Sequence, residues 1–70
     1  MSEIKSIITG IVLSVHVQKD ETVSIGQEVV IIESMKMAIP IESHLAGKVE
    51  NIKVKVGDFV NEDDVLLTIV

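Results

Sequence analysis

The chain has 70 residues, no cysteine, and eleven acidic side chains against six lysines, which gives a net charge of −5. A surface of this sign repels nucleic-acid phosphates, and a single phenylalanine without tryptophan or tyrosine leaves almost no ring for base stacking, so nucleic-acid binding is disfavoured. A chain this short buries only about 60% of the surface that its unfolded form exposes. We therefore expect one small domain spanning residues 1–70, and a carrier or binding module rather than an enzyme with its own cleft.

The lack of cysteine also removes disulfides and thiolate metal ligands as ways to stabilise so small a fold. The first residues lack the apolar core of a signal peptide. No apolar run approaches the roughly 18 residues that a membrane-spanning helix needs. These features predict a cytoplasmic protein with no membrane association.

Valine and isoleucine supply 23 of the 70 residues and alanine only two, a composition that favours strands over helices. In chain order, apolar and polar residues alternate in residues 15–17 and 39–42 and in the second half of 49–56. Residues 29–32 form an unbroken apolar run, typical of a strand that is covered on both sides or lies where a sheet curls. Turn residues separate these runs, at Gly10, Asp20-Glu21, Gly26, Gly47, Gly57-Asp58 and 61–64. The pattern predicts an all-β sandwich or barrel without a helix.

The chain also repeats itself with an offset of 37 residues, residues 6–33 matching residues 43–70. Six identities keep the phase of the strands: Ser6 with Ser43, Gly10 with Gly47, Val12 with Val49, Val17 with Val54, Val23 with Val60, and Ile32 with Ile69. Any two β-rich segments align passably, but these matches fall on glycines and apolar positions. The repeat predicts two similar halves around a pseudo-twofold axis, with residues 34–42 near that axis.

The segment that joins the halves holds an unusual turn. The apolar strands on either side must form a hairpin with its tip at or beside Met35-Lys36. A two-residue hairpin normally requires Asn-Gly or Asp-Gly because φ is positive there, so Met-Lys breaks a local rule, which indicates function. The amine of Lys36 would stand in water, open to acylation by another enzyme. A lone exposed lysine is more commonly plain solvated surface, and we expect one of Met35 and Met37 to pack inward as an ordinary strand residue.

The string Glu33-Ser34-Met35-Lys36-Met37 resembles the Glu-Ala-Met-Lys-Met signature of biotinyl domains, the carboxyl carrier parts of acetyl-CoA, propionyl-CoA and pyruvate carboxylases. The resemblance covers essentially the whole chain. Three further segments are similar to family motifs: 26–29 to Gly-Gln-x-Leu/Val, 47–49 to Gly-x-Val, and 56–60 to the Gly-Asp-x-Val end of Val-x-x-Gly-Asp-x-Val.

This resemblance implies a flattened barrel of two four-stranded sheets with quasi-twofold symmetry (a barrel-sandwich hybrid), with the hairpin at one end and the termini at the other. It implies biotin bound covalently to Lys36, Met35 and Met37 as flanking recognition residues, and Glu33 and Ser34 as candidate contacts to biotin protein ligase. The biotin ring would be carboxylated by a biotin carboxylase and would deliver the carboxyl group at a carboxyltransferase. The chain would then be a carrier without catalytic residues of its own.

Some positions depart from the family pattern. Ser34 replaces alanine, Asp20 and Asp63 stand where turn glycines are common, and Ile8-Thr9 replaces a proline and methionine. The inserted thumb of bacterial acetyl-CoA carboxylase carriers is missing, so that complex is not assigned. The start at Met1 suggests a separate subunit, and a closed barrel is expected to be a monomer.

Two other functions stay open. Lipoyl domains usually carry Asp-Lys-Ala at the same tip, so lipoate is the alternative cofactor on Lys36, and an unmodified adaptor module is the third reading. The carboxyl acceptor is not evident from the sequence.

Other candidate residues predict little chemistry. Residues 62–64, Glu-Asp-Asp, lack the calcium-loop pattern, so no metal site is expected. His16 and His44 have no serine or carboxylate motif to form a triad. Lys53 and Lys55 are interpreted as one solvated strand face, and Phe59 as a core anchor.

Overall fold

The computed structural model describes residues 2–70, which form eight strands and no helix. In chain order the strands are β1 (Ser2–Lys5), β2 (Gly10–Val15), β3 (Thr22–Val23), β4 (Glu28–Ser34), β5 (Met37–Glu42), β6 (Gly47–Ile52), β7 (Phe59–Val60) and β8 (Val65–Ile69). No stretch of residues 2–70 is a helix able to cross a membrane. The predicted all-β class is confirmed.

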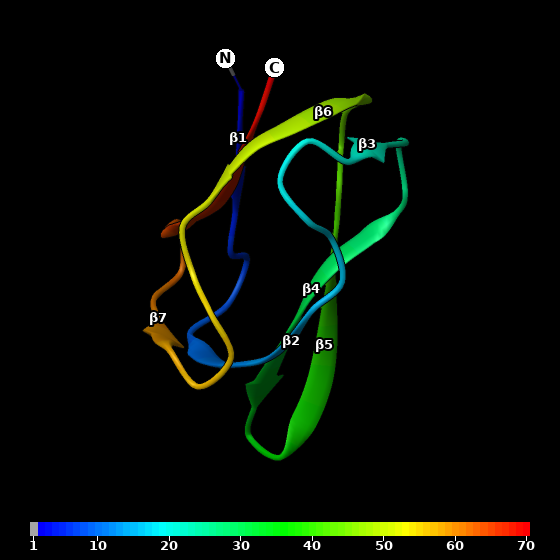
Figure 1. Cartoon of the computed structure of the whole chain (residues 1–70). Coiled ribbons are helices and arrows are strands. Elements are labelled where there is room, and N and C mark those ends of the chain that lie inside the picture. The colour runs from blue at the N-terminus through cyan, green and yellow to red at the C-terminus, as the bar shows by residue number, and fades with distance from the viewer. Residues whose placement is uncertain (1) are drawn as a thin grey trace.

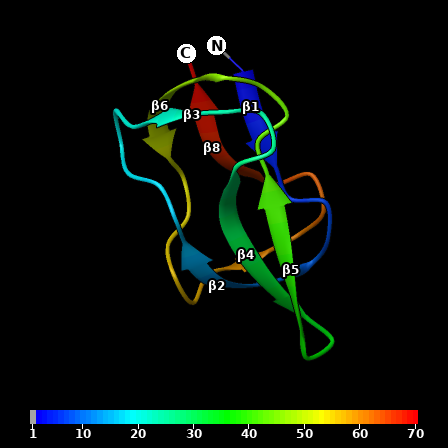
Figure 2. The ribbon, with the colours of Figure 1, turned by 90° about the vertical axis from the view of Figure 1, so that its right-hand side faces the viewer.

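The strands make two four-stranded antiparallel sheets, ordered β1-β8-β6-β3 and β5-β4-β2-β7. The molecule measures 31 × 19 × 18 Å. The β4–β5 hairpin projects beyond the rest of the barrel at one end of the molecule, while both ends of the described chain lie at the other (Figure 1, Figure 2). The expectation that the hairpin lies at one end of the molecule and the termini at the other is confirmed.

A single apolar core fills the space between the sheets. Its fully buried members are Ile4, Val12, Val17, Val23, Val29, Val30, Ile32, Ile41, Val49, Val60, Leu66, Leu67 and Ile69. The apolar run of β4 is explained by a bulge: the register to β5 shifts between Glu28 and Val30, so that Val29 and Val30 are both buried. The register of β8 to β1 shifts at the equivalent position, Leu66, so Leu66 and Leu67 of β8 are also both buried.

The two halves are related residue by residue in their hydrogen bonds. The amide of Ser6 donates to the carbonyl of Asp64 at 2.9 Å, and 37 residues later the amide of Ser43 donates to the carbonyl of Gln27 at 2.8 Å. Each sheet takes its strands from both halves in the same order, since β2, β3 and β4 of the first half correspond to β6, β7 and β8 of the second. The predicted quasi-twofold symmetry is confirmed.

The two halves are also equivalent at the turns whose residues have a positive φ. Asp20 (φ 74°) is equivalent to Gly57 (φ 96°), and Asp63 (φ 75°) is equivalent to Gly26 (φ 87°). Aspartate is one of the side chains that tolerate this left-handed region, so the substituted turns keep the glycine geometry. The turn that each aspartate occupies therefore survives the loss of glycine.

Two expectations about the second half were wrong. Phe59 is 63% exposed rather than a core anchor, because β7 has only two residues and its other residue, Val60, takes the inward position. Lys53 and Lys55 are exposed, as expected, but β6 ends at Ile52, so they lie in the segment after the strand and not on a strand face.

Candidate functional site

The site is built on the turn of the β4–β5 hairpin. The last paired residues of the two strands are Ser34 and Met37, so Met35 and Lys36 form the two-residue turn between them. Their φ angles are 52° and 65°, the pair of positive values that a type I′ turn requires. The tip therefore lies where the sequence predicted it, in a backbone conformation that neither side chain favours.

The strands behind this turn hold it in place. A left-handed residue other than glycine costs roughly 1–2 kcal/mol. Six register pairs join β4 to β5, and Ile32 and Ile41 anchor the two strands in the core with 0% and 3% exposure. Burial of aliphatic side chains of this size stabilises by roughly 1.5–3 kcal/mol each, enough to impose the turn on Met35 and Lys36.

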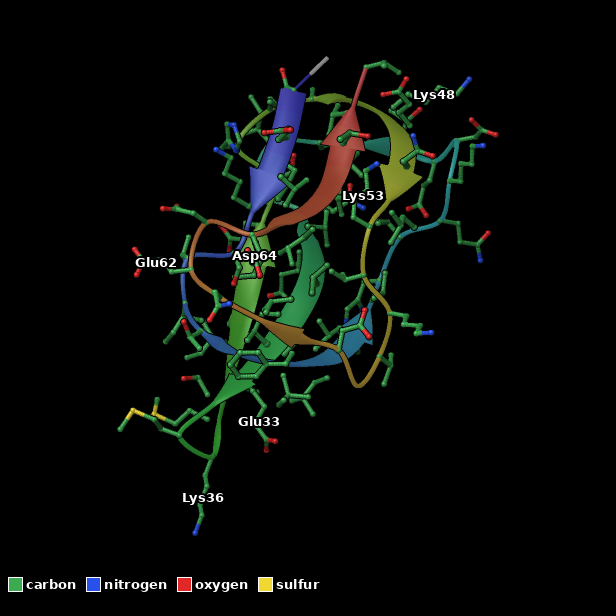
Figure 3. All side chains as sticks on the ribbon, turned by 90° about the vertical axis from the view of Figure 1, so that its left-hand side faces the viewer. Glu33, Lys36, Lys48, Lys53, Glu62 and Asp64 are labelled. Carbon is green, nitrogen blue, oxygen red and sulfur yellow. The ribbon has the colours of Figure 1, made fainter. Side chains whose placement is uncertain are left out.

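The side chain of Lys36 extends from the tip away from the body of the molecule (Figure 3). The Lys36 side chain is exposed. The one salt bridge among residues 2–70 lies elsewhere, on β1, where Lys5 Nζ and Glu3 Oε1 are 4.0 Å apart. Nothing in the described chain neutralises or covers the amine of Lys36. It is free to enter the active site of another protein.

Both methionines beside the lysine are exposed, Met35 by 91% and Met37 by 61%. The expectation that one of them packs inward was therefore wrong. Met37 has the same phase along β5 as the inward-facing Ile39 and Ile41, but it is the first residue of β5, beside the turn of a hairpin that projects beyond the opposite sheet (Figure 2). Two flexible thioether side chains consequently flank the amine in solvent.

The other two predicted site residues lie just behind the turn. Glu33 is exposed, and its Cα partners are Ile11 on β2 and Ala38 on β5. Figure 3 shows its carboxylate leaving the same end of the molecule as Lys36, in a different direction. Ser34 is partly buried at the base of the turn. Glu33 thus belongs to a sheet face next to the tip rather than to the tip itself.

The remaining candidates have structural explanations. Asp64 Oδ2 accepts a hydrogen bond of 2.8 Å from the amide of Asn61 and closes its own turn. Within residues 2–70 no three histidine, aspartate or glutamate side chains are grouped so as to hold a metal ion.

The structure does bring His16 close to one hydroxyl that the sequence analysis missed. Ser14 Oγ and His16 Nε2 are 2.8 Å apart, as their spacing of two on an alternating segment would have indicated. The pair is exposed, and no third side chain of residues 2–70 is hydrogen-bonded to the ring. His44 is exposed in the loop between β5 and β6.

Comparison with known proteins agrees with this geometry. Residues 1–69 match the family of biotin and lipoyl attachment domains, described as "Biotin-requiring enzyme". The chain belongs to the biotin/lipoyl attachment family. It is 52% identical over 60 residues to the biotin/lipoyl attachment protein of Bacillus subtilis, covering 86% of this chain and 82% of that one.

Two other relatives in this family carry different names. The biotin carboxyl carrier protein of Streptococcus mutans is 43% identical over 60 residues, covering 86% of this chain and 46% of that one. The dihydrolipoyllysine-residue acetyltransferase component of the pyruvate dehydrogenase complex from Cupriavidus necator is 41% identical over 56 residues, covering 80% of this chain and 10% of that one.

Among solved structures, the urea carboxylase of Kluyveromyces lactis contains a region that superimposes with a TM-score of 0.92 at 32% identity. The match covers 99% of this chain and 6% of the carboxylase. The attachment-family fold of the chain is therefore shared with a segment of a much larger enzyme.

Proposed function

We propose that the chain is a biotin carboxyl carrier that holds biotin in amide linkage to Lys36 and presents it to partner enzymes. The observation that carries the proposal is the amine of Lys36, exposed at the tip of a projecting hairpin whose two turn residues both have positive φ. The fold could have closed this hairpin more favourably with Asn-Gly. A lysine kept there against backbone preference, with no partner group of its own, fits an attachment point.

The role of the chain in the attachment step is to offer a nucleophile. A ligase supplies the cofactor as an acyl-adenylate, Lys36 Nζ attacks the acyl carbon, an amide bond forms, and AMP leaves as the amine loses a proton. Neither the solvated turn nor the carboxylates of the body stand in the way of this approach (Figure 3). Once bound, biotin supplies a ring that takes up and gives away a carboxyl group, chemistry that belongs to the cofactor and to the partner enzymes.

Tethering explains why a small rigid barrel suffices for this task. The β4–β5 hairpin places the amine beyond the core, so the cofactor would swing between two active sites while the barrel stays folded. A short flexible link holds a tethered group at an effective concentration on the order of millimolar at each site. We propose a biotin carboxylase and a carboxyltransferase as those two partners, by analogy with the named carriers.

Lipoate on the same lysine is the second candidate. It is favoured by the relationship to the dihydrolipoyllysine-residue acetyltransferase component. Biotin is favoured by Met35 and Met37, which stand on both sides of the amine and reproduce the biotinyl triplet.

Competition between ligases tests both candidates together. The chain is incubated with purified biotin protein ligase and lipoate ligase, both cofactors and MgATP, and intact mass is measured. We expect a single adduct of biotin mass that Lys36→Arg abolishes and Lys53→Arg does not. If only a lipoyl adduct forms, lipoate replaces biotin as the proposed cofactor. If neither ligase forms an adduct, the carrier function is overturned in favour of an unmodified adaptor.

A further inference from the structure

Both methionines of the described residues lie beside the amine of Lys36. Met35 and Met37 are exposed by 91% and 61%, and the third methionine, Met1, lies outside the described residues. Neighbouring Cα atoms are about 3.8 Å apart, so each thioether side chain starts one residue from the lysine. Figure 3 shows the sulfur atoms, in yellow, at the same end of the molecule as Lys36. Since sulfur is the atom of methionine that peroxides oxidise, the oxidisable side chains are gathered at the tip of the β4–β5 hairpin.

The rest of the described chain offers a peroxide little to attack. The chain has no cysteine, tryptophan or tyrosine. Its buried core consists of valine, isoleucine and leucine side chains alone. Methionine commonly fills gaps in such cores, yet this core uses none. Oxidation of the tip would therefore change a surface that partners meet and leave untouched the side chains that fold the barrel.

The hairpin fixes the two methionines on either side of the amine. Met35 and Lys36 are the turn residues, with φ of 52° and 65°, and Met37 pairs with Ser34 at the base of the turn. Neither methionine Cα can move away from Lys36 unless the paired strands behind the turn separate. An enzyme that draws Lys36 Nζ into its active site therefore meets the thioether side chains as well.

Oxidation changes what such an enzyme meets. A methionine thioether is apolar and flexible, whereas methionine sulfoxide is polar and chiral. When a polar S=O group is covered and finds no hydrogen-bond donor, its loss of contact with water weakens binding by about tenfold or more. Leucine is close to methionine in size and would present an apolar surface without this sensitivity. The chain instead places leucine in its core, at Leu66 and Leu67, and methionine at its tip.

We propose that Met35 and Met37 are a reversible oxidation site, which hydrogen peroxide converts to sulfoxides and which thereby slows the transfer of an acyl group to Lys36. The inference rests on the proposed attachment function. The sulfur lone pair attacks one oxygen of the peroxide, the O–O bond breaks, and the second oxygen leaves as water with the proton of the transferred oxygen. Methionine sulfoxide reductases reverse the change with two electrons from a dithiol, which becomes a disulfide while the oxygen leaves as water.

The oxidation step is measured on the unmodified chain by intact mass and by tryptic peptides. Trypsin cleaves after Lys36, so Met35 falls in the peptide 20–36 and Met37 in the peptide 37–48. We expect each to gain one oxygen atom at a rate within about threefold of a free methionine amide, Met35 before Met37, because the more exposed sulfur is more accessible. Circular dichroism and thermal unfolding should not change, since neither side chain belongs to the core. Rates more than about tenfold below that of the free amide at both positions would overturn the proposal.

The consequence is measured as kcat/KM for acylation by the purified ligase that forms the adduct in the competition experiment, with the carrier chain as the varied substrate. Catalase removes the peroxide before the ligase is added, so the ligase itself is not oxidised. We expect kcat/KM for the chain with both sulfoxides to fall about tenfold or more. Treatment with methionine sulfoxide reductases A and B and dithiothreitol should restore the original value.

The matched control is Met35→Leu combined with Met37→Leu. It keeps Met1, His16 and His44, so any effect of peroxide elsewhere in the chain persists in it. Its kcat/KM is compared only with its own value before peroxide treatment, and we expect no change. The single variants divide the effect between the two positions, and they replace the double variant if that one is unfolded.

The outcomes separate this inference from the proposed function. If no ligase acylates the untreated chain, the proposed function fails and the effect on acylation fails with it. If the untreated chain is acylated and the chain with both sulfoxides keeps its kcat/KM, the oxidation inference alone is overturned. The same holds if the leucine control loses as much activity as the natural chain, or if the reductases restore none of the loss.

Discussion

The two sheets of this molecule share nearly all of what is buried and little of what is exposed. Positions 37 residues apart have the same backbone hydrogen bonds, the same left-handed turns and identical or similar core side chains, as with Ile32 and Ile69. On the outer surfaces, Phe59 and Ile11 of one sheet replace Thr22 and Lys48 of the other. The features common to both halves are those that fold the barrel, so the features found in one half alone are the place to look for function.

The β4–β5 hairpin is the extreme case of this difference. The connection between the halves has no equivalent elsewhere in the described chain, since the opposite end of the molecule holds the termini instead of a turn (Figure 1). Its two turn residues, Met35 and Lys36, are the only neighbouring pair in residues 2–70 with positive φ. Backbone strain, exposure and asymmetry therefore coincide at one place, next to the apolar outer face.

The largest change in the free energy of unfolding is expected at two equivalent glycines whose surroundings are not equally crowded. Gly10 and Gly47 open equivalent strands, and a Cβ at either position would collide with its neighbour strand. At Gly10 it meets the Glu33 carbonyl and, at 2.7 Å, Ile32 Cγ2; at Gly47 it meets Ile69 Cγ2 and, at 2.7 Å, the Val70 carbonyl. We expect Gly10→Ala to lower the free energy of unfolding by about 3 kcal/mol and Gly47→Ala by about 1–2 kcal/mol.

The difference arises because the atom nearest to the added Cβ is a backbone carbonyl oxygen at Gly10, in a strand with neighbours on both sides, but a side-chain methyl carbon, Ile69 Cγ2, at Gly47. Urea unfolding of both variants measures it. Equal losses would show that the Ile69 side chain yields no more easily than the Glu33 backbone, and the two glycine sites would then be equally crowded.

The next effect concerns the hairpin alone. Met35→Asn combined with Lys36→Gly gives the turn the residues that its backbone favours, and we expect the free energy of unfolding to rise by about 1–2 kcal/mol. Acylation should be abolished. Met35→Asn alone should give part of the gain in stability while Lys36 keeps its amine, which separates turn strain from loss of the amine. A double variant no more stable than the natural chain would show that the turn is unstrained.

Much of this fold was predictable because strand period, glycine spacing and the repeat all describe the buried part of the molecule. Ser6 and Ser43, for example, matched in the alignment and prove to be equally buried, each with 1% exposure. The tip could be located because the strands before and after Met35-Lys36 are too close to be joined in any other way.

The errors lie on the surface, where the core sets no pattern. Phe59 was expected inside because aromatic residues usually are, but a two-residue strand has one inward position and Val60 fills it. Met37 kept the inward phase of its strand and still lies in solvent, since the hairpin outruns the opposite sheet. The exposed apolar surface around Phe59 and Ile11 could not be predicted from the sequence, because it depends on which strands are neighbours in the sheet.

Buried serines provide a smaller and symmetric test. Ser6 Oγ donates to the carbonyl of Ile8, and Ser43 Oγ donates to the carbonyl of Leu45, in both cases two residues along the chain. Replacing either serine with alanine leaves a carbonyl without this partner and should cost about 1 kcal/mol. We expect Ser6→Ala and Ser43→Ala to lower the unfolding midpoint in urea equally. A clear difference between the two midpoints would show that the halves are equivalent in backbone conformation but not in what these side chains contribute to stability.

The smallest expected effect tests the turns in which the halves exchange glycine and aspartate. Asp20→Gly and Asp63→Gly copy the residues at the equivalent positions Gly57 and Gly26, and all four have φ between 74° and 96°. Relief of the left-handed strain, offset by the greater freedom of glycine in the unfolded chain, should raise the free energy of unfolding by about 0.5 kcal/mol for each change.

The reverse substitution isolates the backbone contribution. Nothing lies within 4 Å of a Cβ added at Gly57, so Gly57→Asp introduces no collision and should lose about the 0.5 kcal/mol that Asp20→Gly gains. Paired urea titrations of the two variants measure both changes against the same reference. If Asp20→Gly destabilises the chain instead, the aspartate side chain contributes to its turn in a way that glycine does not, and the two halves then stabilise the same backbone by different means.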